Sequence, residues 1–211
     1  EYGFLLRKNY DNGLQWDLAV HRGLEVGRGD FNLRGPDLRN GRQKADSFHG
    51  MATTARVRYT GIAGLELGAA LQYQDDVSRG TEDNSAILTS AHFIYTNGGF
   101  GLRGLIASWD ISGSTAVAGV TVPGSDIDNQ YGGYIEPSYK WTFENGMALG
   151  VFSRYLYFEN EDAPGGQTEY HAGLNFWPTE NTVVKADWIH EDRANGRANR
   201  DTFNFGVGFA F

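Results

Sequence analysis

The last ten residues of the chain alternate between large apolar side chains and small or polar ones. One face of this segment carries Phe203, Phe205, Val207, Phe209 and Phe211, and the other carries Asn204, Gly206, Gly208 and Ala210. Successive residues of a β-strand point to opposite faces, so the pattern predicts a strand with one bulky apolar face and one small, polar face. A barrel strand with lipid outside and water inside has this pattern, and so does an edge strand of a soluble sheet.

The rest of the chain contains further segments with the same two-residue period and none with a 3.6-residue period. We therefore predict about eleven strands and essentially no helix. The predicted strands are Tyr2–Asn9, Leu14–Gly23, Met51–Tyr59, Leu65–Asp75, Ser85–Tyr95, Phe100–Asp110, Tyr131–Phe143, Met147–Phe158, Thr168–Trp177, Thr182–Asp192 and Thr202–Phe211. Pro137 is unusual within such a segment, because a proline lacks the backbone N–H and normally demotes its strand to an edge or a bulge.

The connections between these segments alternate in length. The short ones are Asp11–Gly13, Gly61–Gly64, Asn97–Gly99, Asn145–Gly146 and Pro178–Asn181. The long ones are Leu24–Gly50, Asp76–Asn84, Ile111–Gln130, Glu159–Gln167 and Arg193–Arg200. Short turns on one rim and long loops on the other are typical of bacterial outer-membrane barrels. A soluble sandwich gives no reason for this alternation, so we predict an all-β, antiparallel transmembrane β-barrel.

The composition agrees with a barrel and removes some alternatives. The 211 residues include 29 Gly and no Cys, with 14% aromatic residues and a mean hydropathy of −0.44. No run approaches the ~18 apolar residues of a membrane helix, but a barrel strand needs only ~10 residues, half of which face water. The formal net charge of −8 argues against nucleic acid as a partner, because neutralising phosphates requires a basic face.

An odd number of strands is inconsistent with a complete bacterial barrel. Single-chain barrels have an even number of strands and both termini in the periplasm. When the strands are counted back from a periplasmic Phe211, the first segment starts on the outside. We therefore expect residues 1–211 to form a single transmembrane barrel domain that lacks its N-terminal strands, with a missed or merged strand as the alternative.

Several stretches resemble a known family in their order and spacing. These are Ala55–Asp76, Gly98–Gly113, Gly132–Trp141, Gly150–Asn160 and Ala172–Asp192. Together they resemble the C-terminal portion of the phosphate-selective porin O/P-like family of Gram-negative outer membranes. The resemblance implies a sixteen-stranded, usually homotrimeric porin, of which about eleven strands are present here. Members include phosphate, pyrophosphate and general channels, so the resemblance does not specify the solute.

The face of each predicted strand opposite its large apolar residues gives a provisional pore lining. The basic candidates are Arg7, Arg56, Arg58, Arg103, Lys140, Arg154 and Lys185, and the acidic ones are Asp17, Glu66, Glu136 and Asp187. The basic residues outnumber the acidic ones, so we expect a modest preference for anions. Arg56 and Arg58 share one face, and their planar guanidinium groups suit phosphate or carboxylate. Alternatively, these arginines pair with acidic residues along a water-filled wall.

Three other patterns carry less weight. Gly99–Gly104 matches the dinucleotide-binding pattern GxGxxG, but a strand-like segment follows it instead of the required helix. His190 alternates onto the face opposite Asp187 and Glu191, and zinc needs three or four converging ligands, so we expect no metal there. Asp126–Asn129 contains possible calcium ligands but lacks a full calcium-loop signature.

The sequence therefore predicts a porin in the outer membrane of a Gram-negative bacterium. Its closing strand would face outer-membrane lipid with Phe203, Phe205, Val207, Phe209 and Phe211. Small hydrophilic solutes or anions would diffuse passively through its water-filled channel, without a cofactor or a reaction. One alternative is a surface adhesion or structural scaffold. Another is a barrel enzyme using Ser153, His92, His171 or His190, although no pattern places a nucleophile, a base and an orienting group together.

The segment Leu24–Gly50 is long enough to fold into the pore, to stay on the surface or to contact another subunit.

Overall fold

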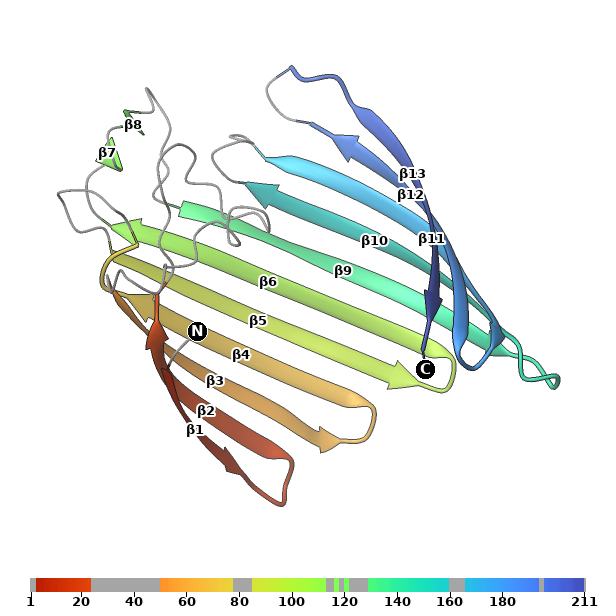
Figure 1. The fold of residues 1–211 in the computed structure, drawn as a ribbon, viewed down its shortest axis with the longest axis horizontal. Coiled ribbons are helices and arrows are strands. Elements are labelled where there is room, and N and C mark those ends of the chain that lie inside the picture. The colour runs from red at the N-terminus through yellow and green to blue at the C-terminus, as the bar shows by residue number, and fades with distance from the viewer. Residues whose placement is uncertain are drawn as a thin grey trace.

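The computed structural model describes residues 3–23, 50–77, 85–112, 116–117, 120–121, 129–159, 166–193 and 196–210. Its main element is one curved antiparallel sheet of 11 strands (Figure 1). These strands are β1 (Gly3–Asn9), β2 (Leu14–Arg22), β3 (Met51–Ile62), β4 (Leu65–Gln74), β5 (Ser85–Asn97), β6 (Phe100–Ser112), β9 (Asn129–Thr142), β10 (Ala148–Glu159), β11 (Gln167–Thr179), β12 (Thr182–Asp192) and β13 (Arg200–Phe209). β7 (Ala116–Val117) and β8 (Val120–Thr121) form a separate two-stranded sheet.

The sequence-based prediction of the strands is confirmed for the described residues. All eleven predicted strands are present, with ends that differ from the prediction by at most three residues, and no described residue is helical. β7 and β8 were not predicted, because two residues per strand are too few to show a period. No helix among the described residues is long and apolar enough to cross a membrane.

Strand order in the large sheet follows chain order, so each strand pairs with its sequence neighbours. The five short turns lie together at one rim of the sheet, and the long connections leave from the opposite rim (Figure 1). Gly13, Gly64 and Gly146 in these turns have φ angles of 85°, 76° and 82°, a left-handed conformation that glycine adopts without steric cost. Within the described residues the sheet is open, because β1 and β13 each pair with one strand only.

One face of the sheet, which we call the outer face, exposes large apolar side chains. On β13, Phe203 and Phe205 are 70% and 84% exposed, and Val207 and Phe209 are exposed beside them. Phe211 lies outside the described residues. Other strands continue this surface with Leu6, Leu18, Val57, Leu67, Leu71, Ile106, Ile135 and Leu174. A soluble sheet buries such residues, and contiguous exposed apolar surface of this kind indicates contact with a partner or a membrane.

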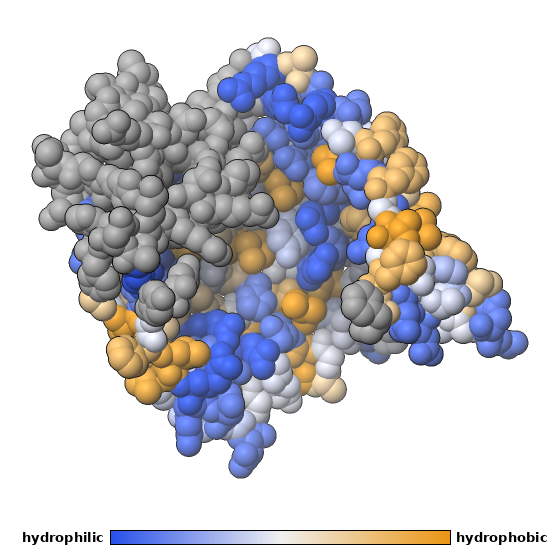
Figure 2. Space-filling view, in the orientation of Figure 1, coloured by the Kyte–Doolittle hydropathy of each residue, from blue (hydrophilic) through white to orange (hydrophobic). Residues whose placement is uncertain are grey.

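The opposite, concave face, which we call the inner face, buries polar side chains. The buried polar residues are Gln15, Asp17, Gln74, Gln130, Glu136, Gln167 and Glu191. Figure 2 shows hydrophilic and apolar patches alternating in the hollow of the sheet. Buried polar groups on the concave side and exposed apolar groups on the convex side are the reverse of a soluble sheet's arrangement.

Pro137 does not place β9 at an edge of the sheet, but it coincides with a local irregularity in the pairing. β9 pairs with β6 on one side and with β10 on the other. Pairing with β6 is continuous past Pro137, whereas pairing with β10 passes from Phe152↔Ser138 to Tyr155↔Ile135 without the two pairs between them. The missing N–H of the proline therefore causes a local gap on the β10 side, and the rest of the ladder holds the strand in place.

Candidate functional site

The inner face carries every residue that the sequence analysis proposed as pore lining. Antiparallel partners point to the same side of a sheet, and the pairs Arg7↔Asp17, Asp17↔Arg56 and Arg103↔Glu136 link these residues across the strands. Lys140, Arg154, Lys185, Asp187, Arg58 and Glu66 follow at even spacings or as register partners on the same face. The strand alternation therefore brings these charged groups onto one surface.

Asp17 lies between two arginines from its neighbouring strands. Its Oδ1 accepts a hydrogen bond from Nε of Arg7 at 2.7 Å, and its Oδ2 accepts one from Nε of Arg56 at 2.8 Å. Nε2 of Gln15 donates to the same carboxylate at 3.1 Å. The carboxylate is only 8% exposed, so these charge-assisted bonds replace the water that it would otherwise bind.

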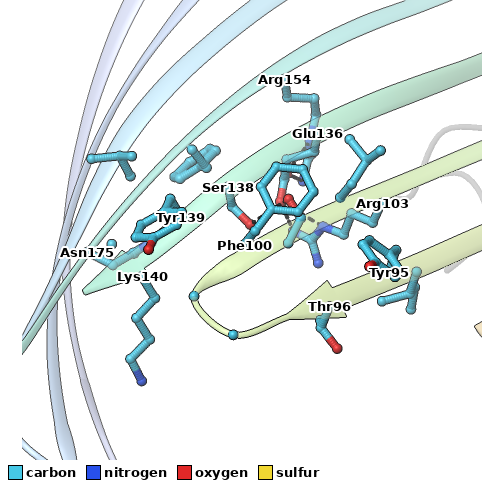
Figure 3. Close-up of a pocket in the computed structure, with 18 of the residues that line it drawn as sticks. Tyr95, Thr96, Phe100, Arg103, Glu136, Ser138, Tyr139, Lys140, Arg154 and Asn175 are labelled. Carbon is cyan, nitrogen blue, oxygen red and sulfur yellow. Dashed lines mark hydrogen bonds and ion pairs between the residues drawn. The ribbon is translucent and has the colours of Figure 1, made fainter. Parts of the chain in front are cut away.

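Glu136 on β9 repeats this arrangement between Arg103 on β6 and Arg154 on β10 (Figure 3). Nε of Arg103 donates to Oε1 at 2.7 Å, and Nε of Arg154 donates to Oε2 at 2.8 Å. The glutamate side chain is 6% exposed, whereas the two arginine side chains are 49% and 25% exposed. A buried carboxylate thus holds two cations that remain open to the hollow, and the group carries a net charge of about +1 at neutral pH.

A third group of this kind was missed by the sequence analysis. Glu191, at the end of β12, accepts a hydrogen bond from Nε of Arg193 at 2.8 Å and another from Nε of Arg200 at 3.2 Å. Arg193 and Arg200 bound a long predicted loop, so strand alternation could not assign their direction. The available signal was the acid at the end of one strand with arginines on either side of the loop.

Arg56 and Arg58 share the inner face, as predicted, but bind different carboxylates. Arg58 Nη1 lies 3.5 Å from Oε2 of Glu66, whose Oε1 is 3.2 Å from Nε2 of His92. A Cβ at Gly68 would come within 2.1 Å of the His92 ring, so this glycine makes room for the imidazole beside Glu66. The pairing of inner arginines with inner acids, which the sequence left as an alternative, is the arrangement found.

Lys140 and Lys185 differ from the arginines because neither forms an ion pair within the described part of the chain. The ammonium of Lys140 lies 4.4 Å from the ring centroid of Trp177, a cation–π contact. Trp177 lies over Gly150, where an added Cβ would be 2.9 Å from the ring. Gly150 on β10 therefore leaves room for the Trp177 ring of β11, and this ring contacts the ammonium of Lys140 on β9.

The Glu136 group and the two lysines line a cavity of about 600 Å³ in the turn half of the inner face. Its charged lining residues are Arg103, Lys140, Arg154, Lys185, Glu136 and Asp187. Cations outnumber carboxylates, and Ser138 and Asn175 add uncharged hydrogen-bonding groups. Such a wall can attract and orient an anion through guanidinium, ammonium and hydroxyl groups.

The residues considered for catalysis do not come together. Ser153 and His190 lie on the outer face, whereas His92 and His171 lie on the inner face of different strands. His171 lies 3.0 Å from Glu169, and His190 lies 3.0 Å from Asp201. Among the residues that the structure describes, no group of three His, Cys, Asp or Glu side chains could hold a metal ion. The loop at residues 24–49 and the possible calcium ligands at 126–128 lie outside the described residues.

Comparison with solved structures identifies porin-like folds. The chain is similar to a porin refined at 1.8 Å resolution, with a TM-score of 0.57 and 14% identity over 99% of this chain and 61% of the porin. It is also similar to a bacterial polysaccharide outer-membrane secretin, with a TM-score of 0.52 and 12% identity over 99% of this chain and 69% of the secretin. The chain thus spans about 61% of that porin's length.

The sequence comparisons add no closer relative. No protein-family model matches the chain, and no curated protein matches it significantly. At these identities the structural similarity shows the fold alone, which is an all-β antiparallel sheet of the porin type. The resemblance to the phosphate-selective porin family remains a prediction.

Proposed function

We propose that this chain forms part of a channel in a bacterial outer membrane through which small hydrophilic solutes diffuse passively. The observation that carries the proposal is the reversed sheet, with exposed phenylalanines on the outer face and hydrogen-bonded charges on the inner face. Lipid is the environment that favours such an outer face, and water filling the hollow favours such an inner face. Fold similarity to a porin supports this proposal, and the function requires neither a cofactor nor a reaction.

A working channel also requires that the two free edges of the sheet be paired. Unpaired N–H and C=O groups in hydrocarbon cost several kcal/mol each, which is why membrane sheets close into barrels. We propose that further strands pair with β1 and β13, as in a sixteen-stranded barrel, and that such barrels associate as homotrimers. The greater length of the similar porin supports the additional strands.

We further propose that the channel prefers anions. The support is the cationic wall of the 600 Å³ cavity, in which Lys140 and Lys185 have no carboxylate partner in the described residues. A charge in a narrow pore with low-dielectric walls has a larger effect on passing ions than the same charge on an open surface.

Planar-bilayer recording of the full-length protein tests the channel and its anion preference. Stepwise conductance is expected, with a reversal potential across a KCl gradient that favours chloride. Replacing Lys140 and Lys185 with Gln should shift that potential toward cation permeation. Lys8→Gln is the matched control, because it removes one positive charge from the outer face of β1 and should leave the potential unchanged. Well-folded protein without conductance contradicts the channel, and a cation-favouring wild-type potential contradicts only the anion preference.

A further inference from the structure

An apolar band interrupts the inner face beside the charged groups. Leu105 of β6, Tyr134 of β9 and Leu156 of β10 are register neighbours on three adjacent strands. All three are half-buried, so each keeps part of its surface exposed.

These three residues line a cavity of about 340 Å³, whose other inner-face walls are Leu88, Ala107, Trp109, Gln130, Gly132 and Phe158. This volume lies within the ~300–1,000 Å³ typical of small-molecule sites. Water in a lumen does not favour exposed apolar side chains, so the band indicates contact with an apolar group.

The apolar band lies directly beside the cations that flank Glu136. Arg103 precedes Leu105 by two residues, and Arg154 precedes Leu156 by two residues, so both steps stay on the inner face. A strand rises about 3.4 Å per residue, which separates the arginine row from the leucine row by about 7 Å. The two rows are in contact, because the Arg154 guanidinium carbon lies 4.7 Å from the ring centroid of Tyr134.

The two arginines keep hydrogen-bond donors for a further anion. Each one binds Glu136 through Nε and Nη2. A guanidinium group has five N–H donors, so its Nη1 group remains available in this arrangement. Two cations share one carboxylate, and the resulting positive charge favours an anionic ligand. Arg103 is half exposed to the hollow, so a ligand can reach it.

We infer that this part of the wall binds small carboxylates that carry a compact apolar or aromatic body, of which benzoate is the simplest probe. The carboxylate accepts hydrogen bonds from Arg103 and Arg154, and the ring lies against Leu105, Tyr134 and Leu156. The arginine row and the leucine row are about 7 Å apart, so a carboxylate joined directly to a ring can reach both rows. Inorganic phosphate gains nothing from the apolar band, and a neutral aromatic gains nothing from the arginines. The inference names a substrate class for the proposed channel and rests on that function.

The test compares block of the channel by benzoate and by acetate, which carries the same charge without the ring. With the full chain in a planar bilayer, benzoate should reduce the KCl conductance at a concentration about ten-fold lower than acetate, because an apolar pocket distinguishes even one methylene by about that factor.

The double variant Leu105→Asn with Leu156→Asn should bring the blocking concentrations of benzoate and acetate together and leave the acetate value unchanged. Val183→Asn, on the inner face of β12 outside this cavity, is the control and should keep the ten-fold difference. Equal block of the wild-type channel by both anions overturns the inference, and so does a difference that persists in the double variant.

Failure of the channel itself is distinguishable from failure of this site. If the protein gives no conductance, the proposed function is contradicted, and calorimetric titration of the protein in nanodiscs decides the binding separately. Tighter binding of benzoate than of acetate, with empty nanodiscs as the blank, supports the site. Equal affinities for the two anions overturn it.

Discussion

At the scale of single residues, the inner face is built from carboxylates that are shared by two cations. Asp17, Glu136 and Glu191 each accept hydrogen bonds from two arginines, and each is more buried than its partners. The carboxylate is therefore the group that holds the arrangement, because removing it leaves two neighbouring cations without their acceptor. The sequence could predict which residues share the face, since alternation determines direction, but it could not predict which arginine meets which acid.

Replacing Glu136 with Gln should lower the stability of the protein. An amide oxygen cannot accept the charge-assisted bonds of both Arg103 and Arg154, so we expect the free energy of unfolding to fall by about 1–3 kcal/mol. Urea unfolding in lipid vesicles, followed by tryptophan fluorescence, measures this change. Glu66→Gln makes the same charge change at a carboxylate with longer contacts of 3.5 and 3.2 Å, and it should cost less. A larger loss for Glu66→Gln would contradict the role given to Glu136.

Glycine provides the space for aromatic rings on the inner face. A Cβ at Gly173 would lie 2.3 Å from Cε1 and 2.5 Å from Cζ of Phe152. Gly173→Ala should therefore destabilise the protein by about 1–3 kcal/mol, as overpacking does. Gly206 is the control on the same face, because nothing lies within 4 Å of a Cβ built there. Gly206→Ala should change the unfolding free energy by no more than about 0.5 kcal/mol, and equal losses for the two variants would refute this account.

At the scale of elements, the chain specifies its strands through the difference between an apolar outer face and a polar inner face. The period of two residues places all eleven strands of the large sheet, and Asn–Gly and related turns delimit them. The two-residue strands β7 and β8 lie beyond this kind of reasoning, and so do the arginines around Glu191, which lie where the alternation ends. The consequence of Pro137 was also not predictable, because the pattern shows a missing N–H but not which neighbour would have accepted its bond.

Replacing Pro137 with Ala should close the gap between β9 and β10. The new N–H can donate across the two pairs now missing between Phe152↔Ser138 and Tyr155↔Ile135. We expect a gain of about 1 kcal/mol, with slower amide exchange at Ser153 and Arg154. Hydrogen–deuterium exchange of β10 peptides measures this, and peptides from β3 serve as the internal reference. Faster exchange in β10 would show that the proline is needed for the local backbone conformation.

At the scale of the whole molecule, the sheet is a wall with different chemistry on its two faces and a free edge at each side. Neither property can be read from one strand: the first requires the register that carries alternation from strand to strand, and the second requires the strand order. The edge strands β1 and β13 expose backbone groups on one side within the described sheet, so the functional assembly has to cover both edges.

The lysines without an acidic partner in the described residues and the apolar band lie toward opposite rims of the inner face. Lys140, Lys185 and the arginines of the 600 Å³ cavity lie in the turn half and at mid-height, whereas Leu88, Trp109 and Phe158 lie toward the rim of the long connections. In the proposed channel, ions driven in opposite directions would therefore meet the cationic segment and the apolar segment in opposite order. The expected consequence is rectification, a current–voltage curve that is steeper at one polarity than at the other. Replacing both lysines with Gln should make the curve more symmetric.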